Sequence, residues 1–125
     1  MADIHAERRD PAAPTEPIDL GRVGDELLDE ARDMASGRAA RTLTPGAHAP
    51  LKQTLVALRE GVELSEHDTN GPATIHVLRG RATLPAVDGR ALELGAGEWV
   101  VIPDVRHSLV AGEDCLALIT VVPTA

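Results

Sequence analysis

From Arg38 to its end, the chain alternates short runs of Val, Leu, Ile and Thr with turns marked by Gly, Pro, Asp and Asn. This alternation is the strongest constraint on the fold, because a strand buries every second side chain and many short strands joined by tight turns form a sandwich or a barrel. Asp88-Gly89 is the clearest hairpin signal among the turns. The pattern predicts strands at residues 39–43, 51–59, 62–66, 73–79, 81–86, 90–94, 98–102, 106–110 and 115–122.

A helical pattern precedes the strands. Over residues 25–37 the apolar side chains recur one helical turn apart, which predicts an amphipathic helix of about three turns. Asp25 is the expected N-cap, and Gly37 is expected to close the other end. A helix this short needs tertiary packing, so its apolar stripe is expected to pack on the barrel or on a partner subunit. The stripe consists of Leu27, Leu28, Ala31 and Met34.

The first part of the chain has no such pattern. Residues 1–24 hold three prolines among alanines and acidic residues, which predicts a flexible, acidic arm. The expected organisation is therefore an arm at 1–24, a helix at 25–37 and a single β-barrel domain at 38–125.

Two of the predicted strands are largely apolar on both faces. Neighbouring residues of a strand point to opposite sides, so the apolar run at 55–58 and the run at 116–122 cannot fill the barrel with all their side chains. A second layer must cover the outward half. The predicted helix or a second subunit can provide that layer.

Composition argues against several classes of partner. Acidic residues outnumber basic ones by 20 to 12, for a net charge of -8, and no Lys/Arg cluster is present to follow a nucleic acid. No apolar run approaches the roughly 18 residues that cross a bilayer, and the N-terminus lacks a signal-peptide pattern. A cytoplasmic protein without nucleic-acid or membrane partners is expected. The single cysteine, Cys115, has apolar neighbours that predict a buried thiol.

The aromatic content limits the ligand. Trp99 is the only aromatic residue apart from the histidines, so any cavity must be lined by aliphatic side chains. Ligands that are held by stacking on aromatic faces are disfavoured. A small aliphatic or small polar molecule fits this composition better.

Two stretches place a histidine after a glycine at similar spacing. Gly61 is followed six residues later by His67, and Gly97 is followed six residues later by Pro103 and then by His107. These stretches resemble the two conserved motifs of the cupin superfamily. The resemblance implies an all-β fold, the double-stranded β-helix or cupin jelly-roll barrel, here with one short N-terminal α-helix. It also implies a homodimer, since small cupins often pair through their sheets.

Further segments are similar to small single-domain, stand-alone cupins of actinobacterial type. They are residues 36–42, 73–81, 107–109 and 113–120. No reaction is implied by this similarity.

The resemblance also implies a set of metal-binding positions. In metal-binding cupins these hold two histidines and a glutamate from the first motif and a histidine from the second. The matching positions here are His67, Thr69, Ala73 and His107, the last after a shortened spacing. Divalent Fe, Mn, Ni or Zn needs three or four strong donors, so any such cofactor is expected to bind weakly.

His76 is another histidine of this region. Its strand position is opposite in parity to Ala73 and Ile75, so it is expected to face away from the cavity unless a bulge turns it inward. The candidate ligand-binding residues are His67, Thr69, Ala73, Ile75 and His107. His76 is the remaining metal candidate.

Three functions remain open on this basis, and no catalytic residue is assigned. The first is a cupin that binds or senses a small molecule through a degenerate metal site. The second is a metal-dependent enzyme, of dioxygenase or isomerase type, acting on a small polar or aliphatic substrate. The third is a structural or interaction protein that acts through its dimer face.

Overall fold

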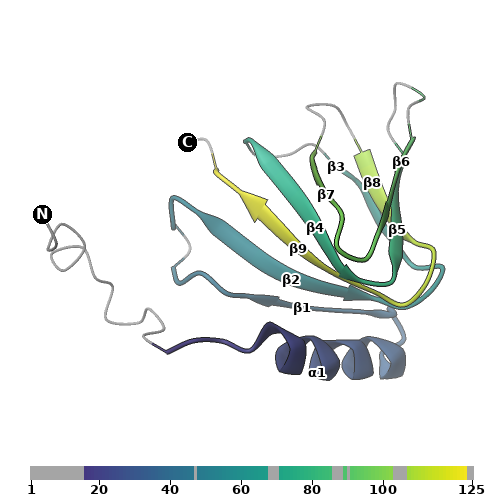
Figure 1. Cartoon of the computed structure of the whole chain (residues 1–125), viewed down its shortest axis with the longest axis horizontal. Coiled ribbons are helices and arrows are strands. Elements are labelled where there is room, and N and C mark those ends of the chain that lie inside the picture. The colour runs from purple at the N-terminus through teal and green to yellow at the C-terminus, as the bar shows by residue number, and fades with distance from the viewer. Residues whose placement is uncertain are drawn as a thin grey trace, which may run out of the picture.

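A computed structural model describes residues 16–46, 48–67, 71–85, 89, 91–102 and 107–123, with the backbone alone at 65–67 and 107. The chain begins with helix α1 and continues as β-strands in two antiparallel sheets (Figure 1). The elements are α1 (Leu20–Asp33), β1 (Arg38–Thr42), β2 (Lys52–Leu58), β3 (Glu63–His67), β4 (Ala73–Arg79), β5 (Arg81–Pro85), β6 (Ala91–Gly95), β7 (Trp99–Val101), β8 (His107–Ala111) and β9 (Cys115–Val121).

The two sheets form the predicted barrel. The five-stranded sheet has the order β1-β2-β9-β4-β7, and the four-stranded sheet has the order β3-β8-β5-β6. Neighbours in the sheets are often distant in sequence, as in a jelly roll. Each predicted strand is present, with ends that differ from the prediction by no more than a residue or two. The predicted hairpin is confirmed as far as its strands, since β5 pairs with β6 and Pro85 lies opposite Ala91, whereas Asp88 lies outside the described residues.

The helix differs from its prediction at both ends. It runs over Leu20–Asp33, and its N-cap is Asp19, whose side chain accepts a hydrogen bond from the backbone N–H of Arg22 at 3.1 Å. The prediction of Asp25 as the cap is wrong, because the apolar stripe extends backwards through Val23. Met34 was expected to pack, but it lies beyond the helix and is 46% exposed.

Glycines shape two of the connections. Gly37 does not end the helix but follows it, with a φ of +71° and a backbone N–H that donates to the Met34 carbonyl at 3.0 Å. Gly80 joins β4 to β5 with a φ of +77°. A Cβ at Gly80 would lie 2.1 Å from the backbone oxygen of Asp114, so only glycine fits there.

Two apolar clusters stabilise the fold. One fills the barrel between the sheets, and the other lies between α1 and the outer face of the five-stranded sheet. In the second cluster the helix stripe packs on β1, β2 and β9, so the predicted second layer is partly the helix itself. Its buried residues are Val23, Leu27, Leu28, Ala31, Ala39, Leu55, Ala57 and Leu116.

Cys115 is fully buried, as predicted. Burial raises the pKa of its thiol to about 11, so the group is protonated and unreactive at neutral pH.

Polar contacts hold the helix on the barrel. Arg79 pairs with Asp25 and also donates to the carbonyl of Gly21 at 2.9 Å. At the other end of α1, the Arg32 Nε donates to Asp114 at 2.8 Å, and Asp114 also accepts from the backbone N–H of Glu60 at 2.9 Å. The Arg32 hydrogen bond and, second, the Glu60 N–H lower the pKa of Asp114.

The helix cluster gives a first prediction. Leu28→Ala should lower the free energy of unfolding by about 2–5 kcal/mol, the range for a buried Leu that loses its contacts. Met34→Ala is the matched control, because that side chain is exposed, and it should change the value by less than about 0.5 kcal/mol. Chemical denaturation measures both. Equal effects of the two substitutions would contradict the packing described here.

Asp114 gives a prediction about pH. Its depressed pKa means that its contribution to stability is present above the ordinary value of 3.8 and is lost as the pH falls through the lower folded value. Asp114→Ala should therefore destabilise the protein at neutral pH by about 1 kcal/mol, and the difference from wild type should shrink in acid.

The matched control is Asp29→Ala, because Asp29 also contacts Arg32, at 3.1 Å, but is more exposed. It should cost less than about 0.5 kcal/mol. Denaturation curves across the acid range test the pair, and an Asp114→Ala effect that grows in acid would contradict the assignment.

Candidate functional site

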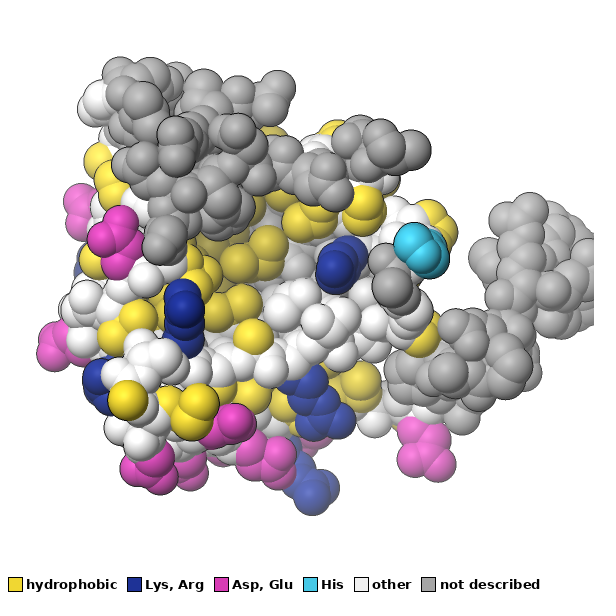
Figure 2. All heavy atoms as spheres, turned by 180° about the vertical axis from the view of Figure 1, so that it is seen from behind, with side chains coloured by type: hydrophobic (Ala, Val, Ile, Leu, Met, Phe, Trp, Pro, Cys, Tyr) yellow, Lys and Arg dark blue, Asp and Glu magenta, His cyan; other side chains and the backbone are white. Residues whose placement is uncertain are grey.

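The inward side chains of the barrel are fully buried at one end and in part accessible at the other. Along β4 and β9 the inward side chains of Val77 and Ala117 are fully buried, whereas Ile119 and Val121 are only partly buried. Val100 of β7 is partly buried at the same end. Seen from behind, hydrophobic side chains gather in a hollow near the middle of the molecule (Figure 2). We refer to this accessible end as the barrel mouth.

The strand register defines the residues at the mouth. On the inward face, Lys52 lies opposite Val121, and Val121 lies opposite Ala73. One step deeper, the row consists of Thr54, Ile119, Ile75 and Val100. The five-stranded sheet therefore supplies one wall that is mostly aliphatic, with a hydroxyl and a cation at β2.

The four-stranded sheet brings two histidine positions together at the end of β3 and the start of β8. His67 pairs in register with His107, and Leu64 pairs with Leu109. Between these two pairs, β3 advances by three residues while β8 advances by two. The extra residue of β3 forms a bulge. Residues directly opposite in an antiparallel pair lie on the same face of a sheet, and the alternation from the buried Leu109 puts position 107 on the inward face.

The other predicted ligand-binding positions lie elsewhere or lack a donor. Ala73 and Ile75 face the interior, as predicted, and Ala73 is only 4% exposed. A methyl group thus stands in the apolar core where the resemblance implies a carboxylate. Thr69 lies outside the described residues.

His76 is on the other face of its strand. It lies opposite Trp99 on one side and Leu118 on the other, while Ala73, Ile75 and Val77 point into the barrel. The register is continuous from Ala73 to Val77, so no bulge turns His76 inward. It does not join the two paired histidine positions.

The described residues supply too few donors for a tightly bound metal. Within the described ranges, no group of three His, Cys, Asp or Glu residues is placed to hold a metal ion. With an alanine methyl at position 73, the inward face of β4 supplies no donor, and two imidazoles fall short of the three or four ligands that a divalent transition metal needs.

Lys52 and Thr54 were not among the predicted site residues. Both share the inward face of β2 with Val56 and Leu58, which belong to the interior cluster. The alternation Lys-Gln-Thr-Leu-Val was a usable signal, since counting back from Val56 places both side chains at the mouth. Lys52 is exposed, as a cation at an opening must be.

The chain is similar in structure to many solved proteins. A cupin superfamily protein from Desulfitobacterium hafniense is 15% identical, with a TM-score of 0.69 over 93% of this chain and 99% of that one. KdgF from Halomonas sp. is 25% identical, with a TM-score of 0.60 over 74% of this chain and 86% of that one. A salicylate 1,2-dioxygenase from Pseudoaminobacter salicylatoxidans is 20% identical, with a TM-score of 0.74 over 95% of this chain and 38% of that one.

The chain has the fold of these cupin proteins, two antiparallel sheets closed into a barrel. No family model and no curated protein sequence matches the chain. Among the described residues, no helix is long and apolar enough to cross a membrane.

The missing donors give a prediction about metal content. Purified wild-type protein should carry well under one equivalent of Fe, Mn, Ni or Zn by elemental analysis, because a weak site loses its metal during purification. Thr69→His combined with Ala73→Glu should raise the content sharply, since this pair restores the two donors that the resemblance implies.

The matched control is Thr69→His combined with Thr74→Glu. Thr74 is adjacent to Ala73 but lies on the outer face, where it pairs with Val101 and Thr120, so its carboxylate would point away from the mouth. Metal uptake by the control equal to that of the first double variant, or stoichiometric metal in the wild type, would contradict the site described here.

Proposed function

We propose that the protein binds or senses a small molecule at the barrel mouth, one with an aliphatic body and an acidic group, without a tightly held metal. The observation that carries the proposal is the change along the barrel interior from a packed apolar end to a partly exposed apolar end. A well-packed barrel that served only as a scaffold has no need to leave inward-facing Val and Ile side chains accessible to water.

The apolar wall accounts for the body of the ligand. Val100, Ile119 and Val121 are partly exposed on the inward face. Covering them stabilises a complex by about 25 cal/mol for each Å² of apolar surface removed from water. The absence of aromatic residues from this wall favours an aliphatic body over a planar ring.

The polar groups account for the acidic group of the ligand. Lys52 brings a positive charge to the rim, and Thr54 brings a hydroxyl donor one row deeper. On the other sheet, positions 67 and 107 pair in register at neighbouring strands, and imidazoles donate hydrogen bonds to anions in either protonation state. In a chain with a net charge of -8, these groups form a local site that favours an anion.

A metal-dependent enzyme is the second candidate. It is favoured by the likeness over 95% of this chain to the salicylate 1,2-dioxygenase, which is a likeness of fold. The alanine at position 73 argues against it. The metal analysis above separates the two candidates.

The binding experiment uses isovalerate and its neutral analogue isovaleramide, followed by calorimetry and by the thermal midpoint. Isovalerate should bind and raise the midpoint with the logarithm of its concentration once it is in excess of its Kd, whereas isovaleramide should bind at least about tenfold more weakly. Lys52→Gln should weaken the binding of isovalerate by about tenfold, the effect of removing one charge-assisted contact, and leave the amide unaffected.

Arg38→Gln is the matched control, because Arg38 is an exposed cation of the same sheet that lies opposite Leu58, at the fully buried end of the barrel. It should not change the affinity for isovalerate. Equal binding of the acid and the amide, or an equal loss in the two variants, would show that charge at the mouth does not select the ligand.

A further inference from the structure

Strand β1 lies at an edge of the five-stranded sheet, and within the described ranges its one strand neighbour is β2 (Figure 1). Two backbone hydrogen bonds of 2.8 Å lie at the ends of this pair, from the N–H of Leu43 to the carbonyl of Gln53 and from the N–H of Arg59 to the carbonyl of Gly37. In an antiparallel pair every second residue bonds to the neighbour, and the residues between direct their N–H and C=O groups to the other side. The odd-numbered residues of β1 therefore bond to β2, and the even-numbered ones do not.

The even-numbered residues form a free edge, which we call the β1 edge and define by the backbone N–H and C=O groups of Arg38, Ala40 and Thr42. All three residues are exposed. The Arg38 carbonyl accepts a hydrogen bond from the Ser36 hydroxyl at 3.5 Å, as expected for a group that does not bond to β2. An edge of this kind can take up an extended peptide as a further strand of the sheet.

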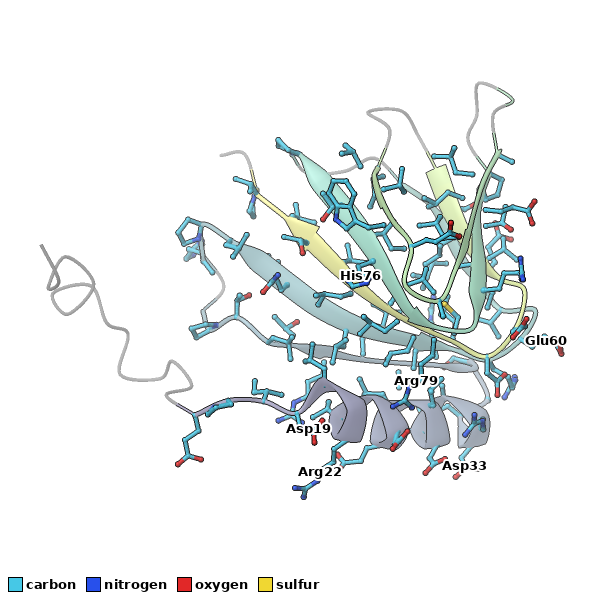
Figure 3. All side chains as sticks on the ribbon, viewed as in Figure 1. Asp19, Arg22, Asp33, Glu60, His76 and Arg79 are labelled. Carbon is cyan, nitrogen blue, oxygen red and sulfur yellow. The ribbon has the colours of Figure 1, made fainter. Side chains whose placement is uncertain are left out.

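A pocket lies beside the β1 edge, between this strand and the first turns of α1. Its volume is about 300 Å³. Figure 3 shows Asp19 and Arg22 at the end where the chain enters the helix. Arg41 points to the helix side of the sheet, because it lies opposite Leu55, which is buried under α1. A side chain of an added strand that points to the same side would lie next to this pocket. The lining consists of residues 17–19, of Arg22, Val23 and Glu26 of α1, and of Arg41 of β1.

The carboxylates of the pocket have partners on the helix. Glu26 lies 3.7 Å from the Arg22 Nε, and the Asp19 side chain accepts a hydrogen bond from the Arg22 backbone N–H. Arg41, by contrast, forms no ion pair with any described residue. A carboxylate brought into the pocket would therefore gain a charge-assisted hydrogen bond from Arg41.

The charges of the two strands also favour an acidic occupant. Strands β1 and β2 carry Arg38, Arg41 and Lys52 and no carboxylate, in a chain with a net charge of -8. A second copy of this chain paired edge to edge would bring the same cations together, which is unfavourable. An extended segment with carboxylates would instead place opposite charges beside them.

We propose that the β1 edge and the adjacent pocket bind an extended acidic segment of another protein. The segment adds a strand to the five-stranded sheet and places a carboxylate in the pocket against Arg41. Its backbone bonds to the β1 edge supply affinity, and the pocket supplies the preference for an acidic side chain. Arg41 lies on the outer face of the sheet, whereas the barrel mouth lies on the inner face, so the interaction does not depend on the proposed function.

The binding test uses the full-length chain and a fluorescein-labelled peptide of about nine residues that alternates Glu with Val, which is long enough to span the five residues of β1. Fluorescence anisotropy should show saturable binding of this peptide. The analogue in which Lys replaces every Glu should bind at least about tenfold more weakly.

Arg41→Gln should weaken the binding of the Glu peptide by about tenfold, the effect of removing one charge-assisted contact. Arg81→Gln is the matched control, because Arg81 is an exposed cation of β5 in the other sheet and its loss changes the net charge equally. It should leave the affinity unchanged.

Ala40→Pro tests the backbone contact. Proline has no N–H, and the N–H of Ala40 points away from β2, so the substitution removes a donor from the β1 edge without removing a bond to β2. The variant should keep a thermal midpoint close to that of the wild type and bind the Glu peptide at least about tenfold more weakly.

Amide hydrogen exchange of the wild type gives an independent measurement. The Glu peptide should slow exchange at the N–H groups of Arg38, Ala40 and Thr42 and leave exchange at Ala39 and Arg41 unchanged, because those two already bond to β2.

Several results would overturn the proposal. They are an absence of saturable binding, equal binding of the Glu and Lys peptides, an equal loss in the two arginine variants, and unaltered binding by a folded Ala40→Pro variant. Peptide binding that leaves exchange along the β1 edge unchanged would also overturn it. So would slow exchange of the same amides in the free protein, which would mean that the edge is already occupied.

Discussion

Strand β9 pairs with other strands along both edges and carries apolar side chains on both faces. The rest of the structure depends on pairing both of these edges and covering both of these faces. It pairs with β2 along its whole length and with β4 on its other edge. Inward, Ala117 and Ile119 meet the second sheet across the barrel. Outward, Leu116 is buried only because α1 lies on it. The helix is therefore part of the fold's hydrophobic closure and not an appendage.

The same strand leads from the packed core to the candidate site. Its inward side chains change from fully buried at Cys115 and Ala117 to partly exposed at Ile119 and Val121, so the apolar core continues into an open mouth without a change of chemistry. Among the described residues, polarity enters at the rim from Lys52 of β2 and from the paired positions His67 and His107, and one row deeper from Thr54. We propose that a site built in this way selects a ligand by covering apolar surface and by charge. At the position where the resemblance implies a carboxylate donor, Ala73 contributes a methyl group.

Local chemistry was enough to predict the strands. Alternation and glycine turns placed every strand, and the same alternation placed Ala73 and Ile75 inside and His76 outside. The helix start was missed because Asp25 has the chemistry of a cap but sits within a longer apolar stripe, where it pairs with Arg79. The opposition of His67 and His107 depends on a bulge after Leu64, which is set by pairing with a strand some forty residues away and leaves no local pattern. The position of α1 on the outer face of the five-stranded sheet also depends on tertiary packing. Leu116 is buried because it lies under the helix, whereas Trp99 lies beyond the helix and is exposed.

The proposed function depends on recognition of an acidic group at the mouth, next to the paired positions His67 and His107, without a tightly held metal. The most direct measurement is a long-range proton–nitrogen correlation spectrum of the imidazoles, assigned with His67→Gln and His107→Gln and recorded with isovalerate and with zinc in turn. Isovalerate should shift the His67 and His107 signals and leave those of His76 unchanged, while an equimolar amount of zinc should not produce a new, slowly exchanging pair of signals. Slow-exchange shifts of both histidines on adding equimolar zinc, with no response to isovalerate, would contradict the account.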